Sequence, residues 1–136
     1  MSKEVIQAKN IGTIYAPISL GEVVDKITIL EIKSSKLTGK AQANTNKELA
    51  ALKECLASID APISDQAMDA LRAVNRSLWE TEDRIREKER NKDFGEEFIE
   101  LARSVYKQND KRAALKKSIN TEHGSALVEE KSYKDY

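Results

Sequence analysis

The chain has 136 residues, a length that suits a single domain with one modest hydrophobic core. Charged residues make up 34% of it and aromatic residues 5%, which favours helices with exposed charged faces over a strand-rich sandwich. Lys plus Arg equal Asp plus Glu at 23 each, so no global positive field attracts nucleic acid or an anionic membrane.

The sequence predicts neither a targeting segment nor a reactive cysteine site. Residues 1–12 lack the apolar core and cleavage site of a secretion signal, and no later stretch is apolar enough to span a membrane, so we expect a cytoplasmic protein. The single cysteine, Cys55, lies among apolar residues and is expected to be buried. The single histidine, His123, lies far from it in sequence, so we expect neither a metal site nor a Cys-His nucleophile pair.

Residues 1–18 predict an irregular arm with one short strand at most, because strand-forming residues around Ile14 are followed by Pro17. The first helix is predicted from about Leu20 to Leu37. Ser19 can cap its first turn, and Glu22 stands where the second half of a capping box belongs. Thr38 and Gly39 indicate its end.

A polar loop is predicted from Thr38 to Asn44, followed by a second helix. Thr45 and Glu48 repeat the capping-box spacing at the start of that helix. Its apolar positions recur at heptad spacing: Leu49, Leu52, Leu56 and Ile59. Pro62 follows and ends the pattern.

Two longer helices complete the chain. Ser64 can cap the third helix, and turn-forming residues from Asn91 to Gly95 separate it from the fourth, which Gly124 can end after His123. The inward stripe of the third helix comprises Met68, Leu71, Asn75, Leu78, Glu82, Ile85 and Glu89. The stripe of the fourth comprises Phe98, Leu101, Val105, Asn109, Arg112, Lys116 and Ile119.

These elements predict an all-α protein, an antiparallel bundle of three to four helices. We expect one domain over residues 1–136, divided into an arm (1–18), a bundle (19–124) and a short tail (125–136). A chain of this size with such long stripes can complete its core with a second copy, so we also expect a homodimer or higher homo-oligomer.

The second half of the fourth stripe is polar, and we call Asn109, Arg112 and Lys116 the polar seam. Such groups cost several kcal/mol each when buried without partners. An antiparallel hairpin of the third and fourth helices would bring Asn75 close to Asn109. The acid that faces Arg112 and Lys116 must then come from the first helix, another subunit or a ligand.

Two functions of different classes fit this polar seam. The first is a pocket that binds or converts a small anionic metabolite without a cofactor, with Asn75, Asn109, Arg112 and Lys116 as ligand contacts. Glu31 or Glu82 would then be the acid-base group if the protein is an enzyme, a point that stays open. The second is a structural or adaptor homo-oligomer in which the same residues set helix register.

A magnesium-dependent enzyme is a further alternative, because carboxylates three residues apart on a helix can assemble a magnesium site. Pairs with this spacing are Glu22 and Asp25, Glu80 and Asp83, and Glu97 and Glu100. The all-α nucleotide pyrophosphohydrolases use similar pairs, but the order and separation differ in this chain. Ion pairs of Glu80 with Arg84 and of Glu82 with Arg86 are the simpler expectation.

Most of the chain resembles a small family of uncharacterised bacterial proteins, the DUF6165 domains of unknown function. The resemblance rests on three parts of the sequence: SLGEVVDKITILEIK at 19–33, LWETEDRIR at 78–86, and FIELARSVYKQNDKRAALKKSIN with GSALVEEKSY between 98 and 133. It implies an all-helical, stand-alone domain and transfers no catalytic residue.

Overall fold

The computed structural model describes residues 10–136 and contains four helices and no strand within them. The helices are α1 (Leu20–Lys36), α2 (Gly39–Ala57), α3 (Asp65–Arg90) and α4 (Glu96–His123). The all-α prediction is confirmed. Residues 10–18 form neither helix nor strand, and the first half of the predicted arm lies outside the described residues.

Three of the predicted helix ends follow from local capping. The Ser19 hydroxyl accepts a hydrogen bond from the Glu22 amide at 3.2 Å, and Ser64 accepts from Ala67 at 3.1 Å. Gly124 ends α4 in the left-handed conformation (φ 63°), which glycine adopts without strain. These residues therefore fix where α1 and α3 begin and where α4 stops.

The predicted loop from Thr38 to Asn44 is wrong, because α2 begins at Gly39. Thr38 makes no side-chain cap, and Thr45 lies inside the helix with its hydroxyl donating to the Ala41 carbonyl. Contacts with α1 hold this early start: Gln42 donates to the Ser34 carbonyl at 2.9 Å. Packing against α1 thus outweighs the polar composition of the segment.

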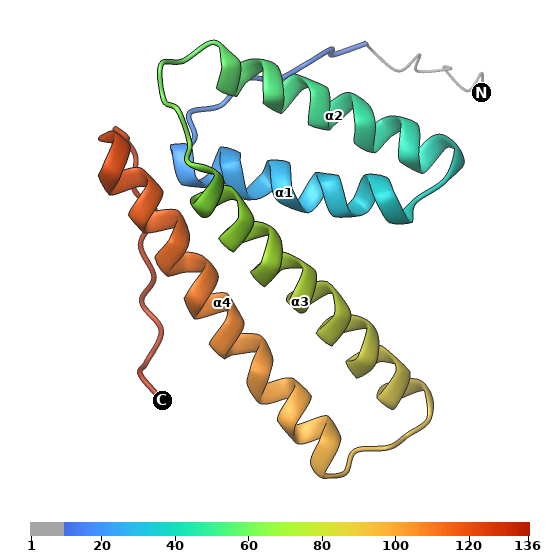
Figure 1. Ribbon diagram of the computed structural model, residues 1–136. Coiled ribbons are helices and arrows are strands. Elements are labelled where there is room, and N and C mark those ends of the chain that lie inside the picture. The colour runs from blue at the N-terminus through green and yellow to red at the C-terminus, as the bar shows by residue number, and fades with distance from the viewer. Residues whose placement is uncertain (1–9) are drawn as a thin grey trace, which may run out of the picture.

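α1 is the central element of the fold, because it packs against all three other helices. It forms one hairpin with α2 and crosses the longer hairpin of α3 and α4, whose far end extends beyond α1 and α2 (Figure 1). The core lies at this crossing and consists of Leu20, Val24, Leu71, Val74, Leu78 and Ile119. The bundle is therefore two crossed antiparallel hairpins.

α2 covers only the outer side of α1. Its apolar residues Leu49, Leu52 and Leu56 are half-buried, and Leu56 alone among them packs against the core. Cys55 is exposed, so the predicted burial of the cysteine is wrong. The heptad pattern of α2 faces one neighbouring helix, and Cys55 lies outside that contact.

Candidate functional site

The start of α1 is anchored to the end of α4. The Gly21 amide donates to the Asn120 side-chain oxygen at 2.6 Å, and the Leu20 amide donates to the Ser125 hydroxyl at 3.2 Å. Both amides lie in the first turn of a helix, where they have no partner within the helix. A Cβ atom at Gly21 would overlap the carbonyl oxygen of Lys116, so glycine permits this close approach.

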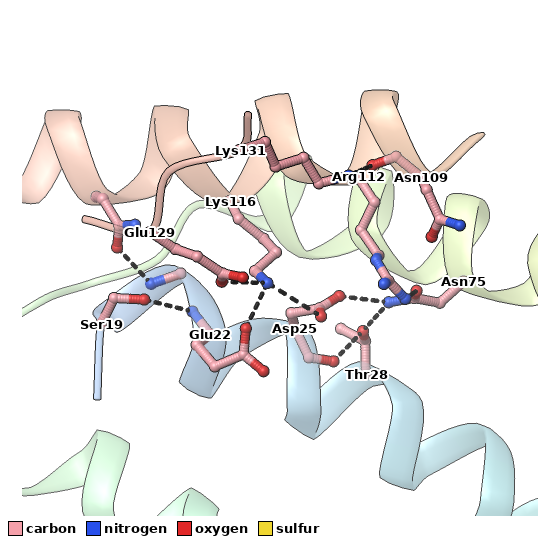
Figure 2. A network of polar contacts seen from close by, with 12 residues as sticks. Ser19, Glu22, Asp25, Thr28, Asn75, Asn109, Arg112, Lys116, Glu129 and Lys131 are labelled. Carbon is pink, nitrogen blue, oxygen red and sulfur yellow. Dashed lines mark hydrogen bonds and ion pairs between the residues drawn. The ribbon is translucent and has the colours of Figure 1, made fainter. Parts of the chain in front are cut away.

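The close approach places two carboxylates of α1 beside Lys116 (Figure 2). Lys116 forms ion pairs with Glu22, with Asp25 at 4.0 Å and with Glu129 of the C-terminal tail at 3.0 Å. Its side chain is 12% exposed and that of Asp25 is 3% exposed. Burial disfavours the ammonium, but the hydrogen bonds with Glu22 and Glu129 outweigh it and raise the pKa of Lys116.

Asp25 is also held from α3. The side-chain amide of Asn75 donates to the Asp25 carboxylate and to the Thr28 hydroxyl, each at 2.8 Å. The Thr28 hydroxyl in turn donates to the backbone carbonyl of Asp25 at 2.8 Å. A buried carboxylate is stable only with such partners. Asp25, Asn75 and Lys116 therefore join α1, α3 and α4, and we call them the buried network.

Arg112 lies at the edge of the buried network. It donates to the Asn75 side-chain oxygen at 3.4 Å, a long hydrogen bond, and forms no ion pair with a carboxylate within residues 10–136. Lys116, one turn further along α4, has three carboxylates around it. Of the two cations of the polar seam, Lys116 is therefore paired with carboxylates in the described part of the chain and Arg112 is not.

Arg112 also lines an open cleft of about 610 Å³ in the angle between α1 and the hairpin of α3 and α4, which we call the central cleft. Its apolar wall consists of Ile29, Ile32, Leu78 and Trp79. Its polar lining consists of Asn75, Glu82, Asp83, Arg86, Asn109 and Arg112. One guanidinium without a carboxylate partner therefore faces an amphipathic depression.

The two acids predicted from the sequence are engaged elsewhere. Glu31 forms a two-point ion pair with Arg72 of α3, with 2.9 Å between Oε2 and Nε, and this hydrogen bond raises the pKa of Arg72. Glu82 lies 3.8 Å from Arg86, the expected pair, and its side chain is half exposed. Neither pairs with Arg112 or Lys116. Glu82 lines the central cleft, and Glu31 does not.

The sequence predicted that Asn75 lies close to Asn109, and the hydrogen bond that joins Asn75 to α4 comes from Arg112. Both asparagines still line the central cleft. The expected pair of Arg84 with Glu80 is also replaced: Arg84 pairs with Glu97 across the hairpin turn at 2.6 Å. In both cases the direction of a long side chain decides the partner, which helix spacing alone leaves open.

Sequence reasoning missed the acids that form ion pairs with Lys116. Asp25 and Glu22 are three residues apart in the first helix, which was one of the expected sources of an acid. They lie on the face of that helix that carries Gly21 and Thr28. Glu22 seemed committed to a capping box, but its carboxylate pairs with Lys116. Glu129 lies in the tail, where no periodicity indicates a direction.

Cys55 and His123, distant in sequence, line one cleft of about 490 Å³ beside the start of α1. No hydrogen bond joins the thiol to the imidazole. Within residues 10–136, no group of three or more His, Cys, Asp or Glu side chains is placed to hold a metal ion. Among the same residues, no helix combines the length and apolar character needed to cross a membrane.

Comparisons with known proteins identify a family and no activity. No curated protein matches the chain, and no solved structure matches it. One family matches residues 14–136, which include all four helices, the buried network and the central cleft. The chain therefore belongs to the family of unknown function DUF6165.

Proposed function

We propose that this protein binds a small anionic metabolite with an apolar body in the central cleft. The observation that carries the proposal is Arg112, whose guanidinium lines the cleft and forms no ion pair with a carboxylate within residues 10–136. A guanidinium presents five N–H donors in a plane and binds a carboxylate through two of them. An anion at this place would accept hydrogen bonds from the N–H groups of Arg112 that do not bind Asn75.

Part of the remaining lining fits the same ligand class, and the carboxylates of Glu82 and Asp83 limit the anionic group to the side of the cleft that carries Arg112. Asn109 is a neutral amide whose N–H groups can donate to an anionic group, whereas both N–H groups of Asn75 are used by Asp25 and Thr28. Trp79, Ile29 and Ile32 offer apolar surface next to these polar groups. Apolar walls with a few placed polar groups are typical of small-molecule sites. We therefore favour a carboxylate attached to an aromatic or aliphatic body.

We assign a different role to Lys116, which sequence reasoning grouped with Arg112 as an anion contact. Three carboxylates surround its ammonium, two of them from α1. This arrangement supports the register-setting alternative for the buried network, because removal of one partner would leave a buried charge. The polar seam then combines a structural half at Lys116 with a binding half at Arg112.

Conversion of the ligand, if it occurs, would draw on Glu82. Of the two acids predicted for acid-base chemistry, Glu82 alone lines the central cleft. A general acid or base must come within hydrogen-bond reach of the reacting group, directly or through one water. Arg112 supports binding of a ligand. Replacement of Glu82 by Gln separates turnover from binding, because it removes the acid-base group and leaves Arg112 in place.

Thermal unfolding with and without ligand tests the proposal. Hydrocinnamate, a carboxylate on a phenyl-bearing chain, is a suitable probe. It should raise the Tm of the wild-type protein by about 10 °C at about 100 times its Kd. Arg112→Ala should unfold close to the wild-type temperature without ligand and lose this rise, and Lys111→Ala, an exposed neighbour, should keep it. Equal stabilisation of Arg112→Ala and the wild type would overturn the proposal.

The homo-oligomer expected from the sequence stays a prediction. Phe94 and Ile99, near the free end of the α3 and α4 hairpin, are about half exposed and could pack against a second copy. Sedimentation velocity tests this expectation, and a monomer at all concentrations would contradict it.

A further inference from the structure

The C-terminal tail (residues 125–136) runs back along α4 without regular structure (Figure 1). Three ion pairs hold it there: Glu129 with Lys116, Glu130 with Lys117, and Lys131 with Asp110. The ring of Tyr136 also stacks at a tilt on Tyr106, with 4.9 Å between the ring centroids. The contacts of the tail are thus mainly electrostatic.

Little apolar burial adds to this attachment. Leu127 is 45% exposed, Val128 is 41% exposed and Tyr133 is 80% exposed. The pairs of Glu130 with Lys117 and of Lys131 with Asp110 are exposed, so salt weakens them, and the pair of Glu129 with Lys116 joins a half-exposed carboxylate to a largely buried ammonium. Residues 129–136 can therefore leave α4 without opening the core, while Ser125 keeps its hydrogen bond with the Leu20 amide.

The Glu129 carboxylate lies at a small cavity of about 70 Å³ beneath the tail, which we call the tail cavity. The cations that line it are Arg112, Lys116, Lys117 and Lys131. Arg112 and Asn109 line the tail cavity and the central cleft alike, so the two spaces adjoin across these side chains. A carboxylate from a half-exposed tail residue therefore occupies a place next to the proposed ligand site.

We propose that Glu129 stands in for a second anionic group of the ligand, which is a dianion. One group of the ligand binds Arg112 in the central cleft, and the other displaces Glu129 from Lys116 and releases the tail. The inference rests on the proposed function, and it adds the class of ligand and a competition with the protein's own tail.

Charge balance makes the two occupants exclusive. Glu22 and Asp25 already face Lys116, and Glu129 is the third carboxylate. A fourth anion at the same ammonium would meet three like charges at short range. Exchange of Glu129 for a ligand carboxylate leaves the local charge unchanged. The second group of the ligand can therefore bind only when the tail withdraws.

Two matched probes test this competition by isothermal titration calorimetry: hydrocinnamate, and phenylsuccinate, which carries one more carboxylate on the same chain. Glu129→Gln should bind phenylsuccinate at least about fivefold tighter than the wild type, because the carboxylate that competes for the largely buried Lys116 ammonium is removed. Its affinity for hydrocinnamate should not change. Asp135→Asn, which removes a tail carboxylate that pairs with no cation in residues 10–136, should match the wild type for both probes.

Tail release supplies a second measurement. Saturating phenylsuccinate should accelerate tryptic cleavage after Lys131 and Lys134, as followed by mass spectrometry, and saturating hydrocinnamate should not. Unchanged cleavage with phenylsuccinate, or equal affinities of Glu129→Gln and the wild type, would overturn the inference. Hydrocinnamate binding that depends on Arg112 would then still stand. Absence of binding of both probes to every variant would overturn the proposed function together with the competition.

Discussion

The side-chain amide of Asn75 in α3 donates a 2.8 Å hydrogen bond to the buried carboxylate of Asp25 in α1. The opposite end of the same amide group accepts from Arg112 in α4. One asparagine thus connects three helices, because it carries a donor and an acceptor that face in different directions. It belongs to the buried network and also lines the central cleft.

Replacement of Asn75 by Ala should lower the free energy of unfolding by about 2 to 3 kcal/mol, because one oxygen of the buried Asp25 carboxylate loses its hydrogen-bond donor. Urea denaturation followed by circular dichroism measures the change. Ser77→Ala, an exposed position on the same helix, should stay within about 0.5 kcal/mol of the wild type. Equal stability of the two variants would show that the buried network contributes nothing to the fold.

Replacement of Gly21 by Ala should destabilise the protein by about 1 to 3 kcal/mol, since the added methyl group overlaps the Lys116 backbone and pushes α1 away from α4. Gly95→Ala is the matched control, because a Cβ there meets only the Asp93 carboxylate at ordinary contact distance. Thermal unfolding compares the two. A Gly21→Ala protein as stable as Gly95→Ala would contradict the close approach of the two helices.

Docking of the tail should depend on pH. Hydrogen bonding to the Lys116 ammonium lowers the pKa of Glu129 below its ordinary value of 4.5. A lowered pKa means that this attachment is fully present above pH 4.5 and is lost as the pH falls through the depressed value. Amide chemical shifts of residues 129–136, followed by NMR during an acid titration, should report release of the tail.

Glu129→Gln is the control for this titration, because its tail lacks the titrating carboxylate and should already be loosened at neutral pH. Tail shifts of the wild type that stay constant through the acid range would count against the ion pair with Lys116.

Local sequence signals were enough for most helix ends. Ser19, Ser64 and Gly124 act within a few residues of themselves, so their capping roles can be predicted from sequence. The start of α2 could not be predicted in this way. It depends on two hydrogen bonds with α1: Gln42 donates to the Ser34 carbonyl, and the Ser34 hydroxyl donates to the Asn46 side-chain oxygen. These bonds form only when the two helices are already packed.

The cations of the candidate site could be predicted from the sequence, and the acids could not, for a similar reason. Periodicity placed Arg112 and Lys116 on one stripe, and the antiparallel hairpin placed Asn75 opposite that stripe. The acids depend on how α1 crosses this hairpin, and sequence spacing carries no information on that crossing. Hence the sequence left the acid open among the first helix, another subunit and a ligand, and Glu22 and Asp25 of α1 pair with Lys116.

Titration of tryptophan fluorescence tests the proposed binding site most directly, because Trp79 is the single tryptophan and lines the central cleft. Hydrocinnamate should change the emission of the wild-type protein along a saturable curve. Arg112→Ala should require at least about tenfold more ligand, since a charge-assisted hydrogen bond contributes about 1.5 to 3 kcal/mol. An emission that does not respond to hydrocinnamate, or a response of equal affinity in Arg112→Ala, would contradict the assignment of Arg112 as the anion contact.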